Sequence, residues 1–113
     1  MPYTYDYPRP NAAADIILLD DPTSPAAILL IQRKNEPFAG QWAFPGGFIE
    51  EDEDPAIAAA RELEEETSLS QIKLSPFRFY GDPQRDPRFH CISCVFAGYA
   101  TPSEVNPKAE DDA

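Results

Sequence analysis

Features that mark exported, membrane-embedded or disulfide-bonded proteins are scarce in this 113-residue sequence. The longest wholly apolar run covers residues 26–31, far short of the roughly 20 residues that a membrane-spanning helix needs. The chain does not open with a basic segment followed by an apolar one, so export is not predicted. The two cysteines, Cys91 and Cys94, are three residues apart in an expected strand, where their side chains face opposite sides. A disulfide between them is therefore not expected, and we predict a reduced, cytoplasmic protein.

Histidine is scarcer still, because the only one is His90, beside Cys91. A structural zinc site takes four ligands in tetrahedral geometry. His90, Cys91 and Cys94 supply only three candidates, on one strand with alternating side-chain directions. We interpret them as packing residues of that strand rather than as zinc ligands.

Basic residues are also few, with nine Lys and Arg against twenty Asp and Glu and a net charge of −11. This balance argues against a nucleic acid as the partner, because a phosphate backbone is bound by basic side chains. The excess is concentrated in residues 46–70, which hold nine acidic residues and one arginine. A run of acids is usually a solvated helix face, so the spacing of these residues has to decide what they do.

The length and the ordinary content of 42% hydrophobic residues predict one compact domain. Residues 1–11 are proline- and tyrosine-rich and are expected to form an extended arm before a domain over residues 12–113. Strands are expected over residues 12–20, 26–34, 73–80 and 89–99, the first two as a hairpin. One helix is expected over residues 55–67, with Asp54 as its N-cap and Pro55 in its first turn. A short strand near Trp42 is also expected.

The helix over residues 55–67 is predicted to carry two different faces. The face expected to pack on the sheet holds Ala56, Ala59, Ala60, Leu63 and Thr67. Glu62, Glu65 and Glu66 fall together on another side, one turn after the small Ala58. Carboxylates at these spacings repel one another, and the C-terminal end of a helix disfavours anions. A hard divalent cation relieves both penalties, although an exposed acidic helix end accounts for the helix alone equally well.

The residues around this helix resemble a known motif. From Gly47 the chain reads Gly-x5-Glu53-x7-Arg61-Glu62-Leu63-x-Glu65-Glu66-x-Ser68-Leu69. This resembles the Nudix box, which is Gly-x5-Glu-x7-Arg-Glu-aliphatic-x-Glu-Glu-x-Gly-aliphatic, and departs from it only at Ser68, where the family has glycine. Ser68 is expected to adopt the left-handed conformation at a cost of about 1 kcal/mol. Residues 40–47, Gly-Gln-Trp-Ala-Phe-Pro-Gly-Gly, also resemble the lead-in of Nudix enzymes.

The resemblance covers residues 12–113 and implies an α/β fold, a Nudix-type α/β/α sandwich with a mixed β-sheet. Family members continue with another strand and a C-terminal helix, so we expect this domain to be incomplete at its C-terminal end.

The resemblance also implies roles for the residues of the motif. Glu62, Glu65 and Glu66 are expected to bind metal and to carry catalysis, and the Gly47 carbonyl is expected to add a ligand. Mg²⁺ is the expected cofactor, with Mn²⁺ as the alternative. Glu53 and Arg61 are expected to form a structural ion pair. Glu50 is either an extra ligand or a solvated loop acid.

The substrate prediction rests on residues 81–88, Gly-Asp-Pro-Gln-Arg-Asp-Pro-Arg, which resemble the ADP-ribose pyrophosphatase branch of Nudix proteins. Arg85, Asp86 and Arg88 are expected to bind substrate, and Arg33 is a weaker candidate. Arginines on a proline-stiffened loop can bind a phosphate with paired hydrogen bonds, although a solvated turn explains the same residues. Trp42 is expected either to stack on a base or to pack at the rim.

The predicted function is Mg²⁺-dependent hydrolysis of a nucleoside diphosphate derivative, most of all ADP-ribose to AMP and ribose 5-phosphate. One alternative is a pyrophosphatase that removes damaged nucleoside triphosphates. The other is a non-catalytic domain that senses ADP-ribose, as in some transcriptional regulators. The predicted partner is a small nucleotide rather than a nucleic acid or a membrane, and a homodimer is compatible with the family.

Overall fold

The computed structural model describes residues 6–7, 9–33, 39–87 and 89–100. Most of the predicted arm, Arg88 and the polar tail from Thr101 onward lie outside these residues. Among the described residues, no helix is both long and apolar enough to cross a membrane.

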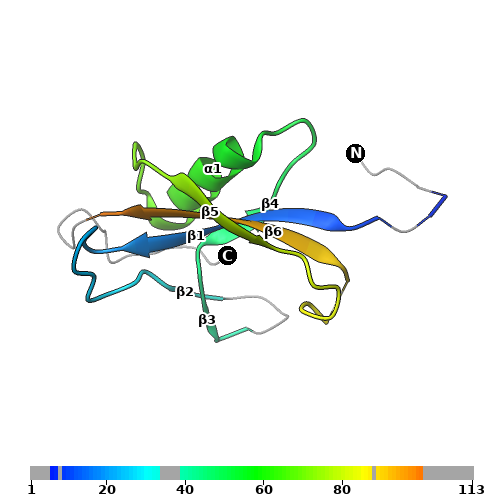
Figure 1. Cartoon of the computed structure of the whole chain (residues 1–113), viewed down its shortest axis with the longest axis horizontal. Helices are drawn as coiled ribbons and strands as arrows, with labels where there is room; N and C mark the ends of the chain where they lie inside the picture. Colours follow the sequence, from blue (N-terminus) through cyan, green and yellow to red (C-terminus); the bar gives the residue numbers. More distant parts are fainter. Residues whose placement is uncertain (1–5, 8, 34–38, 88, 101–113) are drawn as a thin grey trace.

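A four-stranded mixed sheet with the strand order β4-β1-β6-β5 forms the centre of the fold (Figure 1). Its strands are β1 (Asn11–Leu19), β4 (Gly46–Phe48), β5 (Ser75–Tyr80) and β6 (Cys91–Tyr99). β1 and β6 run parallel along their full lengths, from Asn11 opposite Cys91 to Leu19 opposite Tyr99. β4 lies antiparallel on the other edge of β1, and β5 lies antiparallel to β6. The expected strands over residues 12–20, 73–80 and 89–99 are therefore present, each within two residues of its expected start or end.

Helix α1 (Pro55–Thr67) has the predicted bounds because both of its ends carry local signals. The Asp54 side chain accepts a hydrogen bond from the Ala56 N–H at 2.8 Å, and Pro55 stands in the first turn. Ser68 ends the helix in the left-handed conformation, with φ 65°, and its N–H donates to the Glu64 carbonyl at 2.9 Å. The left-handed conformation expected at Ser68 is thus confirmed.

The core lies between α1 and one face of the sheet. It contains alternate residues of β1 together with apolar residues of α1, β6 and the segments that follow them: Ala14, Ile16, Leu18, Ala58, Ala59, Leu63, Leu69, Phe96 and Ala100. The predicted sheet-facing side of α1 was partly wrong, because Ala58 is buried while Ala56 and Ala60 are exposed. Alanine is small enough to pack or to face water, so a stretch with alanines at four of five positions does not define the orientation of its helix.

The predicted hairpin over residues 12–34 was also wrong in extent. β2 consists only of Ile31–Gln32, and it pairs with β3 (Trp42–Ala43) in a separate antiparallel sheet. A single bridge, between Leu19 and Ile28, is what joins this segment to β1. The Asp20 side chain accepts hydrogen bonds from the Ala26 and Ala27 N–H groups, at 2.9 and 3.1 Å. These backbone donors are therefore engaged by a side chain rather than by a neighbouring strand.

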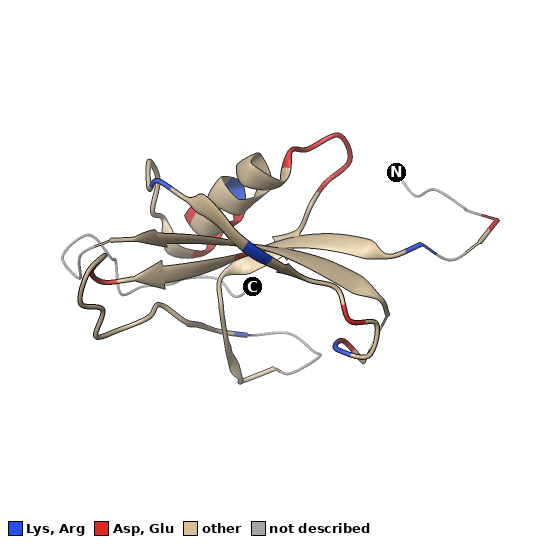
Figure 2. Cartoon of the chain, in the orientation of Figure 1, with Lys and Arg blue, Asp and Glu red and all other residues tan. Residues whose placement is uncertain are grey.

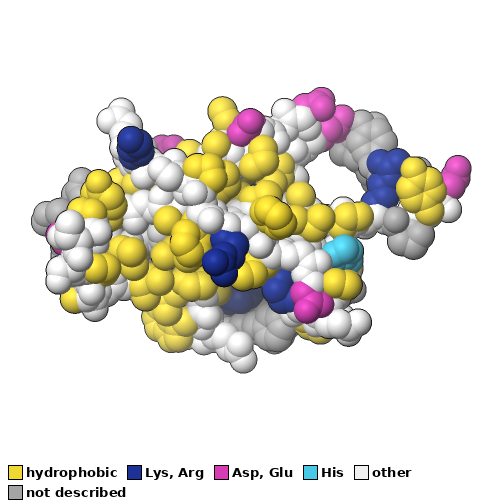
Figure 3. All heavy atoms as spheres, viewed as in Figure 1, with side chains coloured by type: hydrophobic (Ala, Val, Ile, Leu, Met, Phe, Trp, Pro, Cys, Tyr) yellow, Lys and Arg dark blue, Asp and Glu magenta, His cyan; other side chains and the backbone are white. Residues whose placement is uncertain are grey.

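The fold thus has α1 on one side of the sheet and the β2–β3 pair on the other (Figure 1). The predicted α/β class with a mixed sheet is confirmed. The second helical layer of an α/β/α sandwich is not among the described residues, which contain α1 alone as a helix. Strand β5 occupies an edge of the sheet and is exposed along its whole length, and hydrophobic side chains gather over it (Figure 3).

Candidate active site

An ion pair between Arg61 of α1 and Glu53 of the preceding loop ties the helix to that loop. Nε of Arg61 donates to Oε2 of Glu53 at 2.8 Å, and Nη2 donates to Oε1 at 3.0 Å. Nη2 also donates to the Phe48 carbonyl at 3.2 Å, and Glu53 accepts from the Glu50 N–H at 2.9 Å. The hydrogen bonds from Arg61 and then from Glu50 hold the pKa of Glu53 below its usual value, and the bond to Glu53 raises the pKa of Arg61. One guanidinium therefore connects β4, the acidic loop and α1.

We expect Glu53→Gln to lower the melting temperature near pH 7 but to have little effect in acid. A carboxylate whose pKa is lower in the folded state stabilises that state above its unfolded pKa of about 4.3, and the stabilisation is lost as the pH falls through the folded value. Melting curves from about pH 7 to about pH 3 for wild type and variant should therefore converge at the acid end. Glu64→Gln, on the exposed side of α1, is the matched control. If the difference in melting temperature between wild type and Glu53→Gln stays constant across this pH range, the ion pair is not the source of that difference.

The three predicted catalytic glutamates have different surroundings. Oε2 of Glu62 accepts from Nη1 of Arg61 at 3.0 Å. Glu65, whose side chain is 58% exposed, lies 3.4 Å from the same nitrogen. Glu66 is buried, at 5% exposure, and its Oε1 accepts from the Gly46 N–H at 3.0 Å. No three acidic, histidine or cysteine side chains in the described part of the chain are grouped so that they could hold a metal ion. Each of these carboxylates instead has a partner within the protein.

Gly46 and Gly47 allow two carboxylates to approach the backbone of β4. A Cβ atom on Gly47 would lie 2.5 Å from Oε2 of Glu62, and one on Gly46 would collide with Oδ1 of Asp15. Any larger residue at these two positions would displace the carboxylates. Because glycine has no side chain, Glu62 of α1 and Asp15 of β1 can both lie against β4.

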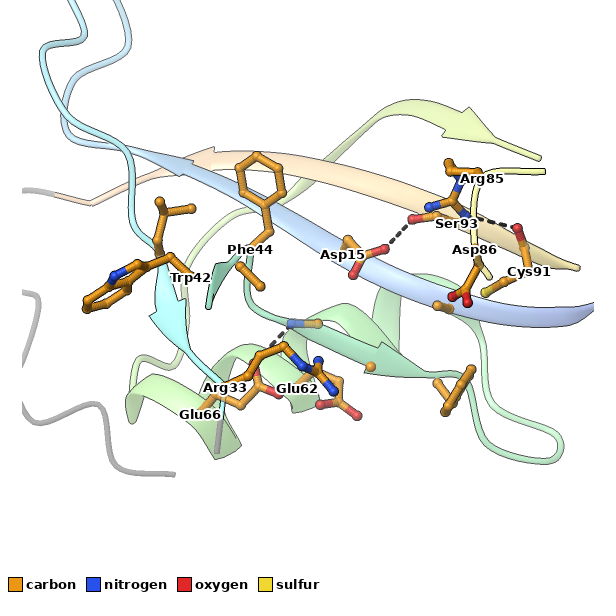
Figure 4. Close-up of a pocket in the computed structure, with 16 residues that line it drawn as sticks. Asp15, Arg33, Trp42, Phe44, Glu62, Glu66, Arg85, Asp86, Cys91 and Ser93 are labelled. Atoms are coloured by element: carbon orange, nitrogen blue, oxygen red, sulfur yellow. Dashed lines mark hydrogen bonds between the residues drawn. The ribbon is translucent and has the colours of Figure 1, made fainter. Parts of the chain in front are cut away.

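A cavity of about 620 Å³ joins these residues to the predicted substrate-binding residues (Figure 4). Its size lies within the range of small-molecule sites, about 300–1,000 Å³. Its lining includes the following polar residues and glycines: Asp15, Arg33, Gly46, Gly47, Glu62, Glu66, Arg85, Asp86 and Ser93. Trp42, Phe44 and Phe48 supply an aromatic part of the wall.

Six of the predicted residues thus meet in one cavity, namely Arg33, Gly47, Glu62, Glu66, Arg85 and Asp86. The lining does not include Glu65, Glu53 or Arg61, although Arg61 donates to Glu62, which does line the cavity. Arg88 lies outside the described residues. Acidic residues are concentrated along the loop before α1 and on α1 itself, which also carries Arg61, whereas the other basic residues lie on other segments (Figure 2). Trp42 is 64% exposed at the edge of the cavity, which is a rim position.

The structure also places Asp15 and Ser93 in this cavity, two residues that the sequence did not single out. Asp15 of β1 accepts a hydrogen bond from the Ser93 hydroxyl, and burial raises the pKa of Asp15. Nη2 of Arg85 donates to the Cys91 carbonyl at 2.9 Å, which holds the guanidinium at this end of the cavity. The sequence signal that could have identified Asp15 is that it is a single carboxylate within the otherwise apolar residues 12–19.

The three residues weighed as zinc ligands lie just before β6 and within it. Nε2 of His90 lies 2.8 Å from the Gly81 carbonyl, just before the strand begins. Neither cysteine is in a disulfide, and Cys91 lines the cavity while Cys94 packs against the core. The two cysteines therefore face opposite sides of the sheet, as predicted.

Comparison with known proteins agrees with the motif. The family model described as NUDIX domain matches residues 9–113. The chain is 45% identical over 107 residues to the ADP-ribose pyrophosphatase of Methanocaldococcus jannaschii, a match that covers 95% of this chain and 60% of that protein. The chain therefore spans less than two thirds of that relative.

Solved structures share the fold. A MutT/nudix family protein from Enterococcus faecalis superimposes with a TM-score of 0.82 at 28% identity, over 99% of this chain and 44% of that one. The NUDIX domain of Shewanella oneidensis NrtR, crystallised with ADP ribose, superimposes with a TM-score of 0.78 at 27% identity, over 90% of this chain and 70% of that one.

Proposed function

The chain belongs to the Nudix family. From this membership and from the geometry of the cavity, we propose that the protein is a pyrophosphohydrolase acting on a nucleoside diphosphate derivative. The proposed reaction is the hydrolysis of ADP-ribose to AMP and ribose 5-phosphate. Similarity to an ADP-ribose pyrophosphatase, and to a domain crystallised with ADP ribose, supports this substrate. The observation that carries the proposal is one cavity lined both by Gly47 and the acidic residues Glu62 and Glu66 and by the arginines Arg33 and Arg85.

The donor atoms present suit a hard divalent cation, Mg²⁺ or alternatively Mn²⁺, and the described side chains would have to move together to hold it. The carboxylates of Glu62, Glu65 and Glu66 and the Gly47 carbonyl offer only oxygen donors, which is the ligand type these cations prefer. A Cβ atom on Gly47 would lie 2.5 Å from Oε2 of Glu62, so Glu62 and Gly47 are neighbours in the cavity wall. Glu62 and Glu66 line the cavity, so we assign them the leading roles, whereas Glu65 would have to leave Arg61 to join them. When bound, such an ion neutralises pyrophosphate charge and lowers the pKa of a coordinated water.

The protein's own residues would position the substrate and the water. Arg85, held by the Cys91 carbonyl, and Arg33 would bind phosphate oxygens through charge-assisted hydrogen bonds. A carboxylate among Glu62 and Glu66 would align the attacking water and accept its proton. Arg61 and Glu53 would hold the loop and helix that carry these glutamates. A cytoplasmic location and a homodimer stay predictions.

A hydrolysis screen tests the proposal. The purified chain should release AMP and ribose 5-phosphate from ADP-ribose in the presence of Mg²⁺ or Mn²⁺, with a higher kcat/KM than for nucleoside triphosphates. Chromatography of the products measures both reactions. A preference for triphosphates would instead identify a nucleotide-sanitising pyrophosphatase. Tight binding of ADP-ribose without hydrolysis would identify a sensing domain.

A further inference from the structure

Asp15 is an acidic residue of the cavity wall that belongs to neither the Nudix motif nor the arginine loop. It lies in the middle of the sheet, opposite Gly46 of β4 and Val95 of β6. One of its oxygens accepts from the hydroxyl of Ser93, which is 3% exposed, and the other lies against Gly46. Figure 4 shows Asp15 between the glutamates of α1 and the group formed by Arg85, Asp86 and Ser93. Its position is therefore set by three strands of the sheet.

A carboxylate at this place is unfavourable for the fold. Burial raises the pKa of Asp15, while the bond from Ser93 and the charge of Arg85 offset only part of that effect. A charged group removed from water destabilises a protein unless it is paired and hydrogen-bonded. Ser93 supplies one neutral donor, and Arg85 is engaged with the Cys91 carbonyl. Core packing alone thus gives no reason for an acid at residue 15.

The chemistry of a carboxylate restricts what it can contact in a substrate. Phosphate oxygens and a carboxylate repel each other at short range unless a cation lies between them. Asp15 is not among the proposed metal ligands, so it is poorly suited to a phosphate subsite. Hydroxyl groups, in contrast, donate hydrogen bonds that a carboxylate accepts strongly. Arg85 borders the same region and suits the adjacent phosphate. An acid and an arginine side by side match a sugar phosphate, which offers hydroxyls next to a phosphate.

We propose that Asp15 is a specificity-determining residue, an inference that rests on the proposed function. Its carboxylate accepts a hydrogen bond from a hydroxyl of the ribose beyond the pyrophosphate, and Ser93 fixes the orientation of that carboxylate. The same carboxylate would repel the third phosphate of a nucleoside triphosphate placed at that position. Asp15 therefore both favours a nucleoside diphosphate sugar and disfavours a triphosphate.

The test compares the affinities of ADP-ribose, ADP and ATP for wild type and Asp15→Asn. Titration calorimetry with a chelator and no added metal measures binding without turnover. Asparagine keeps the shape and an acceptor for Ser93, but it loses the charge. We expect Asp15→Asn to weaken ADP-ribose binding about tenfold, to leave ADP within about twofold, and to leave ATP unchanged or bound more tightly. Ser93→Ala should shift the three affinities in the same directions by smaller factors.

Two controls separate this role from a structural one. Asp52→Asn makes the same chemical change at an exposed loop residue and should leave all three affinities unchanged. The melting temperature of Asp15→Asn should equal or exceed that of wild type, because the buried charge is gone. Equal losses for ADP-ribose and ADP, or no loss for either, would overturn the assignment of Asp15. Absence of hydrolysis by wild type would contradict the proposed function alone, because these affinities do not depend on turnover.

Discussion

Replacing Glu62 or Glu66 with glutamine is expected to reduce kcat/KM for ADP-ribose at least about a hundredfold, corresponding to roughly 3 kcal/mol of transition-state stabilisation. Both side chains line the cavity, and glutamine keeps their shape while removing the charge that would hold a divalent cation. The fold should tolerate the change. Oε1 of a glutamine at residue 66 can still accept from the Gly46 N–H, and one charge of a repelling pair four residues apart disappears.

The measurement is steady-state hydrolysis across Mg²⁺ and Mn²⁺ concentrations, accompanied by melting curves. Glu64→Gln is the matched control, because Glu64 is exposed on the same helix and does not line the cavity. Glu65→Gln adds a further comparison. A loss as large as that of Glu66→Gln would mean that Glu65 leaves Arg61 to bind metal, whereas a small loss would leave Glu62 and Glu66 as the ligands. Activity near wild type in both Glu62→Gln and Glu66→Gln would refute the assignment of the metal site.

Arg85→Ala is expected to lower kcat/KM for ADP-ribose about ten- to a hundredfold, since losing a hydrogen bond to a charged group commonly costs about 1.5–3 kcal/mol. The bond from Nη2 to the Cys91 carbonyl holds the Arg85 guanidinium beside the cavity before substrate arrives. Little reorganisation is then needed on binding, so most of the interaction energy can appear as affinity.

The loss should be greater for ADP-ribose than for a triphosphate if Arg85 binds the phosphate next to the distal ribose. Arg78→Ala, on the exposed edge strand β5, is the control for removing an arginine outside the cavity. Arg88→Ala tests the other arginine predicted from the sequence. Equal losses for both substrates would make Arg85 a general phosphate-binding residue instead.

Helix α1 shows how much of this protein could be predicted from local sequence. Its N-cap, its first-turn proline and the left-handed residue at its end are interactions between residues at most four positions apart. The Nudix motif is local in the same sense, since the Glu53–Arg61 pair spans eight positions around one loop and helix. Features of this kind depend little on the rest of the fold, which is why the bounds of the helix over residues 55–67 were predicted without error.

The alanines of α1 and the hairpin over residues 12–34 show where local patterns failed. Alanine at residues 56, 58 and 60 is compatible with either side of the helix, so the side that faces the sheet was decided by packing against β1. The segment over residues 26–34, which begins with the apolar run 26–31, was compatible with a long strand. Instead, the Asp20 carboxylate binds the Ala26 N–H at the start of the segment, and Ile31 pairs with Ala43 in a separate sheet.

By itself, the sequence determined the family motif, the helix and the set of charged residues available for catalysis, because neighbouring residues define all three. Only the tertiary structure decided which of those residues share a cavity. The parallel pairing of β1 with β6 joins residues about eighty positions apart, and that pairing places Asp15 beside Ser93 and brings Arg85 near both. The packing of α1 turned Glu66 toward Gly46 and left Glu65 exposed beside Arg61. Such contacts depend on the packing of distant segments, and no periodicity within a single segment carries that information.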